Sequence, residues 1–243
     1  MDGISSRGII LNSREYKDKD RLVSVLTKDY GLITVCAKGC GKQGSKNAFM
    51  SVPFMVIDIV CSISHGYYYL KDGSIVENNA GIMNSLEALA TASHFAECLM
   101  DSSIQSENFK EAYELAAYAF YSLSQDPKRF KTLYSAFNWR LLTIAGFTII
   151  YEDVIPDKRY RLSISGGDIR PDASGISGRS VKALNHFATC SLKELFAVKL
   201  DPEMEEELKT FTRDYLCCQF DKEYNALSVL DSLPRSSSGQ DIE

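Results

Sequence analysis

The hydrophobic pattern of the chain changes its period near residue 84, and this change constrains the fold more than any other feature. Before it, short apolar segments rich in β-branched residues are separated by turn residues, as is typical of strands. After it, apolar residues recur every three or four positions, which is the period of an amphipathic helix. We therefore expect an α+β protein in which the strands come first and the helices follow.

Five strand-like segments lie within the first 80 residues. They read RGIILNS, RLVSVLT, GLITVCAK, VPFMVIDIVC and GYYYLK, and Asp29-Tyr30-Gly31 predicts a hairpin turn between the second and the third. The number matches the five-stranded barrel of the OB-fold. An SH3-like barrel or a mixed α+β domain would have a similar strand count, so these alternatives stay open.

Capping signals predict where the helices of the second part begin. The signals are Asn84 with Glu87, Asp126 with Pro127, Ser191 with Glu194, and Asp201 with Pro202. We expect an OB-fold barrel over residues 1–80 and an all-α domain over 81–233, with an irregular segment at 151–179. Residues 234–243 are expected to be a disordered tail.

The composition is that of a folded protein without disulfides. Hydrophobic residues make up 45% of the chain and charged residues 24%. The seven cysteines are odd in number and mostly have apolar neighbours, which favours reduced, buried thiols. Neither an 18-residue apolar run nor a signal-like opening is present, so a cytoplasmic location without membrane contact is expected.

The charge is distributed unevenly along the chain, although its net value is −5. Residues 1–50 carry nine basic and five acidic side chains, and no acidic residue lies between Asp29 and Asp58. Such a basic region can neutralise a phosphate backbone. The predicted DNA contacts are Arg14, Lys19, Arg21, Lys38, Lys42 and Lys46.

A glycine-rich loop offers a second interpretation. Gly39, Gly41 and Gly44 match the G-x-G-x-x-G spacing of dinucleotide sites, so a nucleotide-binding enzyme is the alternative function. The fingerprint needs a helix directly after it, whereas Pro53 and another strand follow here. We find no recognisable nucleophile, metal or kinase motif, and we expect neither an enzyme nor a cofactor. A small-molecule-responsive regulator is a third possibility, without a helix-turn-helix to support it.

Several motifs together resemble the RecO family of bacterial DNA repair proteins. They are RGIIL at 7–11, Arg14, DRLVSVLT at 20–27, AKG at 37–39, Pro53-Phe54, FNWRLLTIAGF at 137–147, SGRSVKALN at 177–185, and Phe211 with Arg213. The resemblance implies a recombination mediator that binds single- and double-stranded DNA and anneals complementary strands. It further implies partners, namely RecR, single-stranded-DNA-binding protein (SSB) and, indirectly, RecA in the RecF pathway, and association with the nucleoid.

Two expectations refine this resemblance. Many family members bind zinc through four cysteines in the irregular segment, but Arg170 and Ala173 stand where cysteines would be, and 151–179 holds neither Cys nor His. We therefore expect no structural zinc, an apolar cluster in its place, and a pairing of Arg170 with Asp153 or Asp157. The acidic SSB tail needs cations beside apolar residues, and the candidate partner residues are Lys128, Arg129, Lys131 and Arg140, next to Phe130, Leu133 and Trp139.

Overall fold

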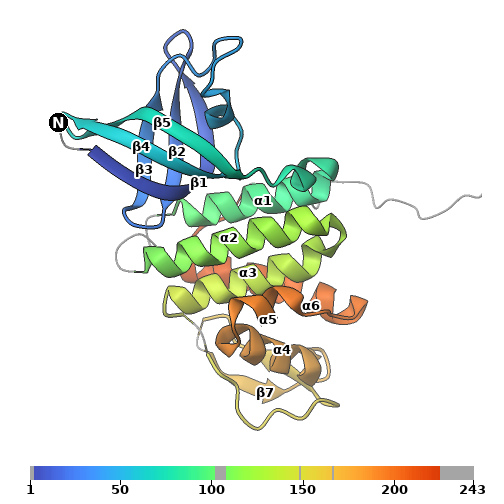
Figure 1. Cartoon of the computed structure of the whole chain (residues 1–243). Coiled ribbons are helices and arrows are strands. Elements are labelled where there is room, and N and C mark those ends of the chain that lie inside the picture. Colours follow the sequence, from blue (N-terminus) through green and yellow to red (C-terminus); the bar gives the residue numbers. More distant parts are fainter. Residues whose placement is uncertain (1–2, 102–107, 148, 166, 225–243) are drawn as a thin grey trace, which may run out of the picture.

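The protein has a β-barrel at one end, layered helices in the middle and a small sheet at the other end (Figure 1). The computed structural model describes residues 3–101, 108–147, 149–165 and 167–224. The expected tail at 234–243 lies outside these residues. The α+β class with a barrel before the helices is confirmed.

Five strands close the barrel in the order β1-β2-β3-β5-β4. They are β1 (Gly3–Tyr16), β2 (Asp20–Thr27), β3 (Gly31–Ala37), β4 (Val56–Ser64) and β5 (Tyr67–Glu77). The β3–β5 seam is parallel and the other pairs are antiparallel. This closed arrangement has the five-strand count of the OB-fold, as predicted.

The barrel interior is filled by alternate residues of its strands. Val23 and Val25 of β2 face Val35 of β3 and Ile57 of β4, and all four are fully buried. The short 3-10 helix η1 (Ala48–Ser51) places the fully buried Met50 in the same cluster. The loop between β3 and β4 therefore contributes to the barrel core.

Helices form most of the second part of the chain. They are η2 (Ala80–Asn84), α1 (Leu86–Leu99), α2 (Phe109–Gln125), η4 (Pro127–Arg129), α3 (Phe130–Ile144), α4 (Gly178–Thr189), α5 (Leu192–Ala197) and α6 (Pro202–Phe220). Helix α3 is central and buried on most sides, as expected of a helix covered by other helices. Trp139 of α3 is fully buried against Phe211 and Tyr215 of α6.

Two of the four predicted helix starts hold without change. Ser191 and Glu194 form a capping box, and the Asp201 side chain accepts from the backbone N–H of Met204. At α1 the prediction was wrong by one residue, because Ser85, not Asn84, accepts from Ala88 N. At the remaining start, Asp126 and Pro127 begin the 3-10 helix η4, which precedes α3, and the Asp126 side chain makes no capping hydrogen bond there.

The barrel and the helices share a continuous core. The rings of Phe54, just before β4, and Phe120 of α2 stack with centroids 5.2 Å apart. Ile9 and Leu26 of the barrel belong to the same buried cluster as the helices. The Asn79 side-chain amide donates to the Phe54 carbonyl at 2.7 Å, which fixes the chain where it leaves the barrel. The orientation of the barrel is thus set by packing.

The segment at 151–179 contains a three-stranded sheet, so the second part of the chain is mainly helical rather than all-α. Its strands are β6 (Arg159–Leu162), β7 (Ile169–Pro171) and β8 (Ile176–Ser177), in the order β7-β6-β8. Five residues were expected to form the apolar cluster of this segment. Tyr151, Tyr160 and Leu162 are buried in the helical core, Ile169 is partly buried against it, and Ile164 is 41% exposed.

The predicted pairing of Arg170 across this segment does not occur among the described residues. Arg170 lies on β7 opposite Arg161 of β6, and the ion pairs are made by other arginines. Arg161 pairs with Asp172 at 2.9 Å, and Arg159 pairs with two glutamates of α6. Strand pairing places Arg170 on an exposed strand, where it does not form the ion pair with Asp153 or Asp157 that we expected.

Candidate nucleic-acid interface

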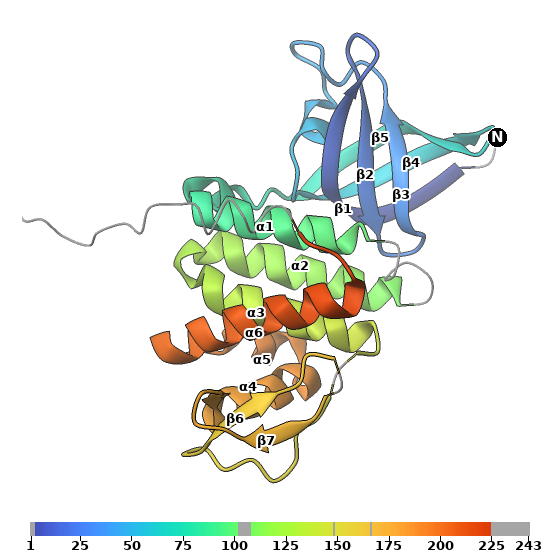
Figure 2. The same ribbon diagram turned by 180° about the vertical axis from the view of Figure 1, so that it is seen from behind.

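Two loops meet at the end of the barrel that points away from the helices (Figures 1 and 2). One is the β1–β2 turn and the other is the glycine-rich loop after β3. The Asp20 carboxylate accepts from Gly39 N at 2.7 Å, and the Lys19 carbonyl accepts from Gly41 N at 3.0 Å. These two hydrogen bonds bring together lysines that lie about 20 positions apart in the sequence.

Glycine is required at two positions of this contact. Gly39 has φ +65°, a conformation that side chains with a Cβ rarely adopt. A Cβ at Gly41 would lie 3.2 Å from the Lys19 carbonyl oxygen, which is tighter than most real contacts. The glycine spacing thus serves the contact between two loops.

The same loop is a poor match for a dinucleotide site. That site needs the free N–H groups of a helix N-terminus against the pyrophosphate. Here the four-residue η1 and then β4 follow the loop. The geometry does not favour the nucleotide-binding alternative.

Two of the six predicted contact residues form ion pairs among the described residues. Arg14, Lys19, Lys38, Lys42 and Lys46 are exposed, and Arg21 is half-buried. Lys46 Nζ lies 3.3 Å from Asp72, and Arg21 lies 3.5 Å from Glu15. Both pairs are accessible to water, so the cations can exchange these partners for phosphates at little cost.

The strand register separates the arginines. Arg14 is aligned with Leu22, on the outer surface of the barrel. Arg21 is aligned with Ala37, whose side chain belongs to the interior, so Arg21 lies at the barrel rim. Arg14 and Arg21 therefore face different sides of the same hairpin, while Lys19, Lys38 and Lys42 lie at the contact between the two loops.

Sequence reasoning left three further residues out of the predicted contacts. Lys17 Nζ lies 5.2 Å from the centroid of the Tyr16 ring, at the tip of the β1–β2 hairpin. Lys38 Nζ lies 5.1 Å from the centroid of the Tyr69 ring in the same way. Tyr16, Lys17 and Tyr69 thus extend the basic loops with aromatic surface. The sequence signals for this were the Tyr67-Tyr68-Tyr69 run, whose alternation favours at least one exposed ring, and the placing of Tyr16 beside Lys17.

The thiol of Cys36, in β3 just before the glycine-rich loop, is not a reactive one. Cys36 of β3 is buried, and burial raises the pKa of its thiol, as does the nearby Asp20 carboxylate. Lys38 and Lys17 lower this pKa without outweighing the effect of burial. A protonated thiol is a weak nucleophile and a weak metal ligand. Among the described residues, no group of three or more His, Cys, Asp or Glu could hold a metal ion.

The four predicted partner residues lie on η4 and α3, and three of them bind parts of this chain. Arg140 donates from Nε to the Phe187 carbonyl at 2.7 Å and from Nη2 to the Cys190 carbonyl at 2.5 Å. Arg129 donates to the Val198 carbonyl at 2.6 Å, and Lys131 forms an ion pair with Glu206. Lys128 is exposed.

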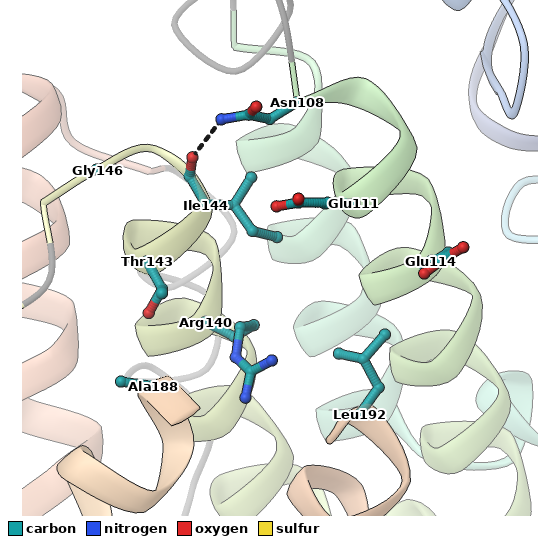
Figure 3. Close-up of a pocket in the computed structure, with 9 residues that line it drawn as sticks. All are labelled: Asn108, Glu111, Glu114, Arg140, Thr143, Ile144, Gly146, Ala188 and Leu192. Carbon is teal, nitrogen blue, oxygen red and sulfur yellow. Dashed lines mark hydrogen bonds between the residues drawn. The ribbon is translucent and has the colours of Figure 1, made fainter. Parts of the chain in front are cut away.

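A pocket of about 540 Å³ lies beside Arg140, between α2, α3 and the start of α5. Figure 3 shows the Arg140 guanidinium within it, with Glu111 and Glu114 of α2 on the opposite wall. Leu133 and Trp139, which we expected next to the cations, are fully buried. The apolar surface of this pocket therefore comes from other residues, such as Ile144 and Leu192.

Comparison with known families accounts for nearly the whole chain. The family described as "Recombination protein O N terminal" matches residues 1–79, and "Recombination protein O C terminal" matches residues 83–227. The chain belongs to the RecO family. Within this family, the barrel coincides with the N-terminal match and the helices and small sheet with the C-terminal match.

Curated relatives cover more than nine-tenths of the RecO-family chain. The "DNA repair protein RecO" of Clostridium perfringens is 28% identical over 241 residues, which is 93% of this chain and 97% of the relative. That of Clostridium acetobutylicum is 22% identical and covers 93% of this chain and 96% of the relative. The protein is thus a DNA repair protein of this family. In the described part of the chain, no helix is both long and apolar enough to cross a membrane.

Proposed function

We propose that this RecO-family protein binds single- and double-stranded DNA through the basic end of its barrel and anneals complementary strands. The observation that carries the proposal is the contact between the two loops, through Asp20–Gly39 and Lys19–Gly41, which gathers lysines at one end of the molecule. Neutralised phosphates repel each other less, so two strands held on such a surface can pair. This chemistry needs neither a catalytic residue nor a cofactor.

The wider role proposed for the chain is that of a mediator at the nucleoid. In this role it works with RecR to help load RecA onto DNA coated by SSB. The support for it is the family membership and the full-length similarity to proteins named for DNA repair. The partners themselves are inferred from the family resemblance.

Salt dependence tests the DNA-binding part of the proposal. Each phosphate neutralised on a single strand contributes roughly 0.7 to the slope of log affinity against log salt. Replacing Lys38, Lys42 and Lys46 by Ala should flatten the slope by about two. The matched control removes the same charge at the other end of the molecule, where Lys182, Lys193 and Lys199 are also exposed.

Two outcomes would contradict this proposal. One is a slope and an affinity that the barrel substitutions leave unchanged. The other is an equal loss from the control substitutions, since this would show that net charge rather than the barrel end governs binding. A strand-annealing assay with both triple variants should rank them in the same order as their affinities.

For the partner surface, we propose that the SSB tail binds on η4 and α3, around Lys128, Arg129, Lys131 and Arg140. Because Arg140 also holds two carbonyls at the end of α4, Arg140→Ala is expected to lower stability as well as any tail affinity. Lys128→Ala is the cleaner variant, since Lys128 is exposed. A labelled tail peptide that binds both variants as tightly as wild type would move the site elsewhere.

A further inference from the structure

The tyrosine run at the start of β5 puts two aromatic rings on the outside of the barrel. Tyr68 is aligned with Val35 and packs against the barrel core. Tyr67 and Tyr69 flank it and therefore face outward, because side chains alternate across a strand. They stand roughly 7 Å apart along the strand.

Tyr67 is far more exposed than is usual for a large aromatic side chain. Its exposed fraction is 67%, the highest among the large hydrophobic side chains described. No ring–ring or cation–π partner is found for it among the described residues. Packing within this chain therefore gives no reason for a large aromatic ring at this position.

The backbone beneath Tyr67 is held firmly. His65 and Gly66 connect β4 to β5 with φ values of +50° and +78°, as in a tight two-residue hairpin turn. Ser64 pairs with Tyr67 directly across this turn. The ring is thus presented by a structured hairpin, so little backbone entropy is lost when a ligand binds it.

A cation lies beside the Tyr69 ring. The Lys38 ammonium lies 5.1 Å from the Tyr69 centroid, and Lys38 opens the glycine-rich loop. Lys46 reaches the same strand farther along, at Asp72. Aromatic faces alternating with lysines can take the bases and the phosphates of one strand at the same time.

We propose that Tyr67 and Tyr69 form a stacking platform for the bases of single-stranded DNA, with Lys38 on the adjoining phosphate. The inference rests on the proposed function and adds to it a contact that a duplex cannot make, because paired bases are stacked on one another. On this proposal the β5 tyrosines make the contacts that are specific to single strands, and the lysines supply the general affinity for phosphate.

The experiment compares two oligonucleotides of equal length, a thymine homopolymer and an abasic strand with the same phosphates. Tyr67→Ser should weaken binding to the thymine strand at least about fivefold, the lower end for one stacked base, and leave abasic binding unchanged. Tyr67→Phe should keep wild-type affinity for both, because it retains the ring. Tyr121→Ser, which removes a 49% exposed tyrosine from α2, is the matched control.

The possible results distinguish a failure of the stacking proposal from a failure of the proposed DNA binding. Unchanged thymine binding by Tyr67→Ser, or an equal loss on both strands, overturns the stacking platform. If the lysine variant still flattens the salt slope in that case, DNA binding at the barrel end stands. A wild-type protein that binds neither strand overturns both proposals. Since Trp139 is the single tryptophan and is fully buried, its fluorescence verifies that each variant is folded.

Discussion

Arg159 of β6 donates from Nη2 to Glu207 of α6 at 2.5 Å, across 48 positions of sequence. The Glu207 carboxylate also accepts from Ser177 N, Ser177 Oγ and Ser180 Oγ, at 3.0, 2.9 and 2.6 Å. One largely buried carboxylate therefore joins the small sheet, the start of α4 and α6. This is the segment in which many family members are expected to use zinc.

Loss of the Glu207 carboxylate should destabilise the protein. Burial raises its pKa, but the hydrogen bonds from Ser180 and Ser177 and the charge of Arg159 outweigh burial, so the net pKa is below the ordinary value. Glu207→Ala is expected to cost roughly 2 kcal/mol of unfolding free energy at pH 7, measured by chemical denaturation. Because the folded pKa is depressed, this contribution is present above the unfolded pKa and is lost as pH falls through the folded one.

Glu203→Ala is the control for this measurement. Glu203 pairs with the same Arg159 at 3.0 Å but is 56% exposed. An exposed ion pair contributes little, so the cost should stay within about 1 kcal/mol. Equal costs for the two glutamates would show that burial of the Glu207 carboxylate is not what matters.

The protein is expected to keep its stability when metals are removed. Structural zinc needs four Cys or His ligands, and residues 151–179 contain neither residue type. Metal analysis of untagged protein should find far less than one equivalent of zinc, and melting curves with and without chelator should coincide. One bound equivalent, or a large loss of stability with chelator, would refute this expectation.

A buried histidine should make the protein sensitive to mild acid. His94 of α1 is fully buried, with Nε2 2.8 Å from Asn138 Oδ1 and its ring next to Tyr134. Burial lowers its pKa to about 4, and the Asn138 hydrogen bond opposes this only in part. The unfolded chain therefore binds the proton more readily, so stability present above the unfolded pKa is lost as pH falls toward the folded one.

The expected size of this loss is about 3 kcal/mol between pH 6.5 and pH 4. Unfolding free energies of wild type and His94→Gln should differ in their pH slope over this window, whatever their difference at pH 7. His186→Gln, at an exposed position on α4, controls for the loss of a histidine as such. Parallel curves for wild type and His94→Gln would contradict the prediction.

The N-cap of α1 can be tested by a pair of adjacent substitutions. The Ser85 hydroxyl accepts from Ala88 N at 3.2 Å and donates to the Glu87 carboxylate at 2.7 Å. Ser85→Ala should cost about 1 kcal/mol of unfolding free energy, the usual value for a lost N-cap. Asn84→Ala should cost less, because Asn84 ends η2 and does not cap α1. A larger cost for Asn84→Ala than for Ser85→Ala would restore the sequence-based assignment of Asn84 as the N-cap.

The sequence by itself determined the features that depend on neighbouring residues. The change of hydrophobic period separates the barrel from the helices, because period 2 and period 3.6 bury one face of a strand and of a helix. The Ser191 and Asp201 caps were predictable because their bonds span three positions. Alternation along a strand puts Tyr67 and Tyr69 on one face of β5 and Tyr68 on the other.

Tertiary structure alone decided the features that depend on distant partners. The strands of the small sheet are too short to show a period, and Glu207 holds them from a helix far along the chain. Ser85 and Asn84 are both good caps, and the extended backbone at Ser85 selects between them.

The free or bound state of each cation was likewise decided by the fold. Arg140 is a cation on a helix in the sequence, and carbonyls at the end of α4 bind it in the structure. The lysines of the barrel end are exposed, and the hydrogen bonds that Asp20 and Lys19 accept bring their loops together. The physical reason is the same in each case: a charge or a backbone amide takes the partner that packing brings within hydrogen-bonding distance, and sequence spacing does not encode that distance.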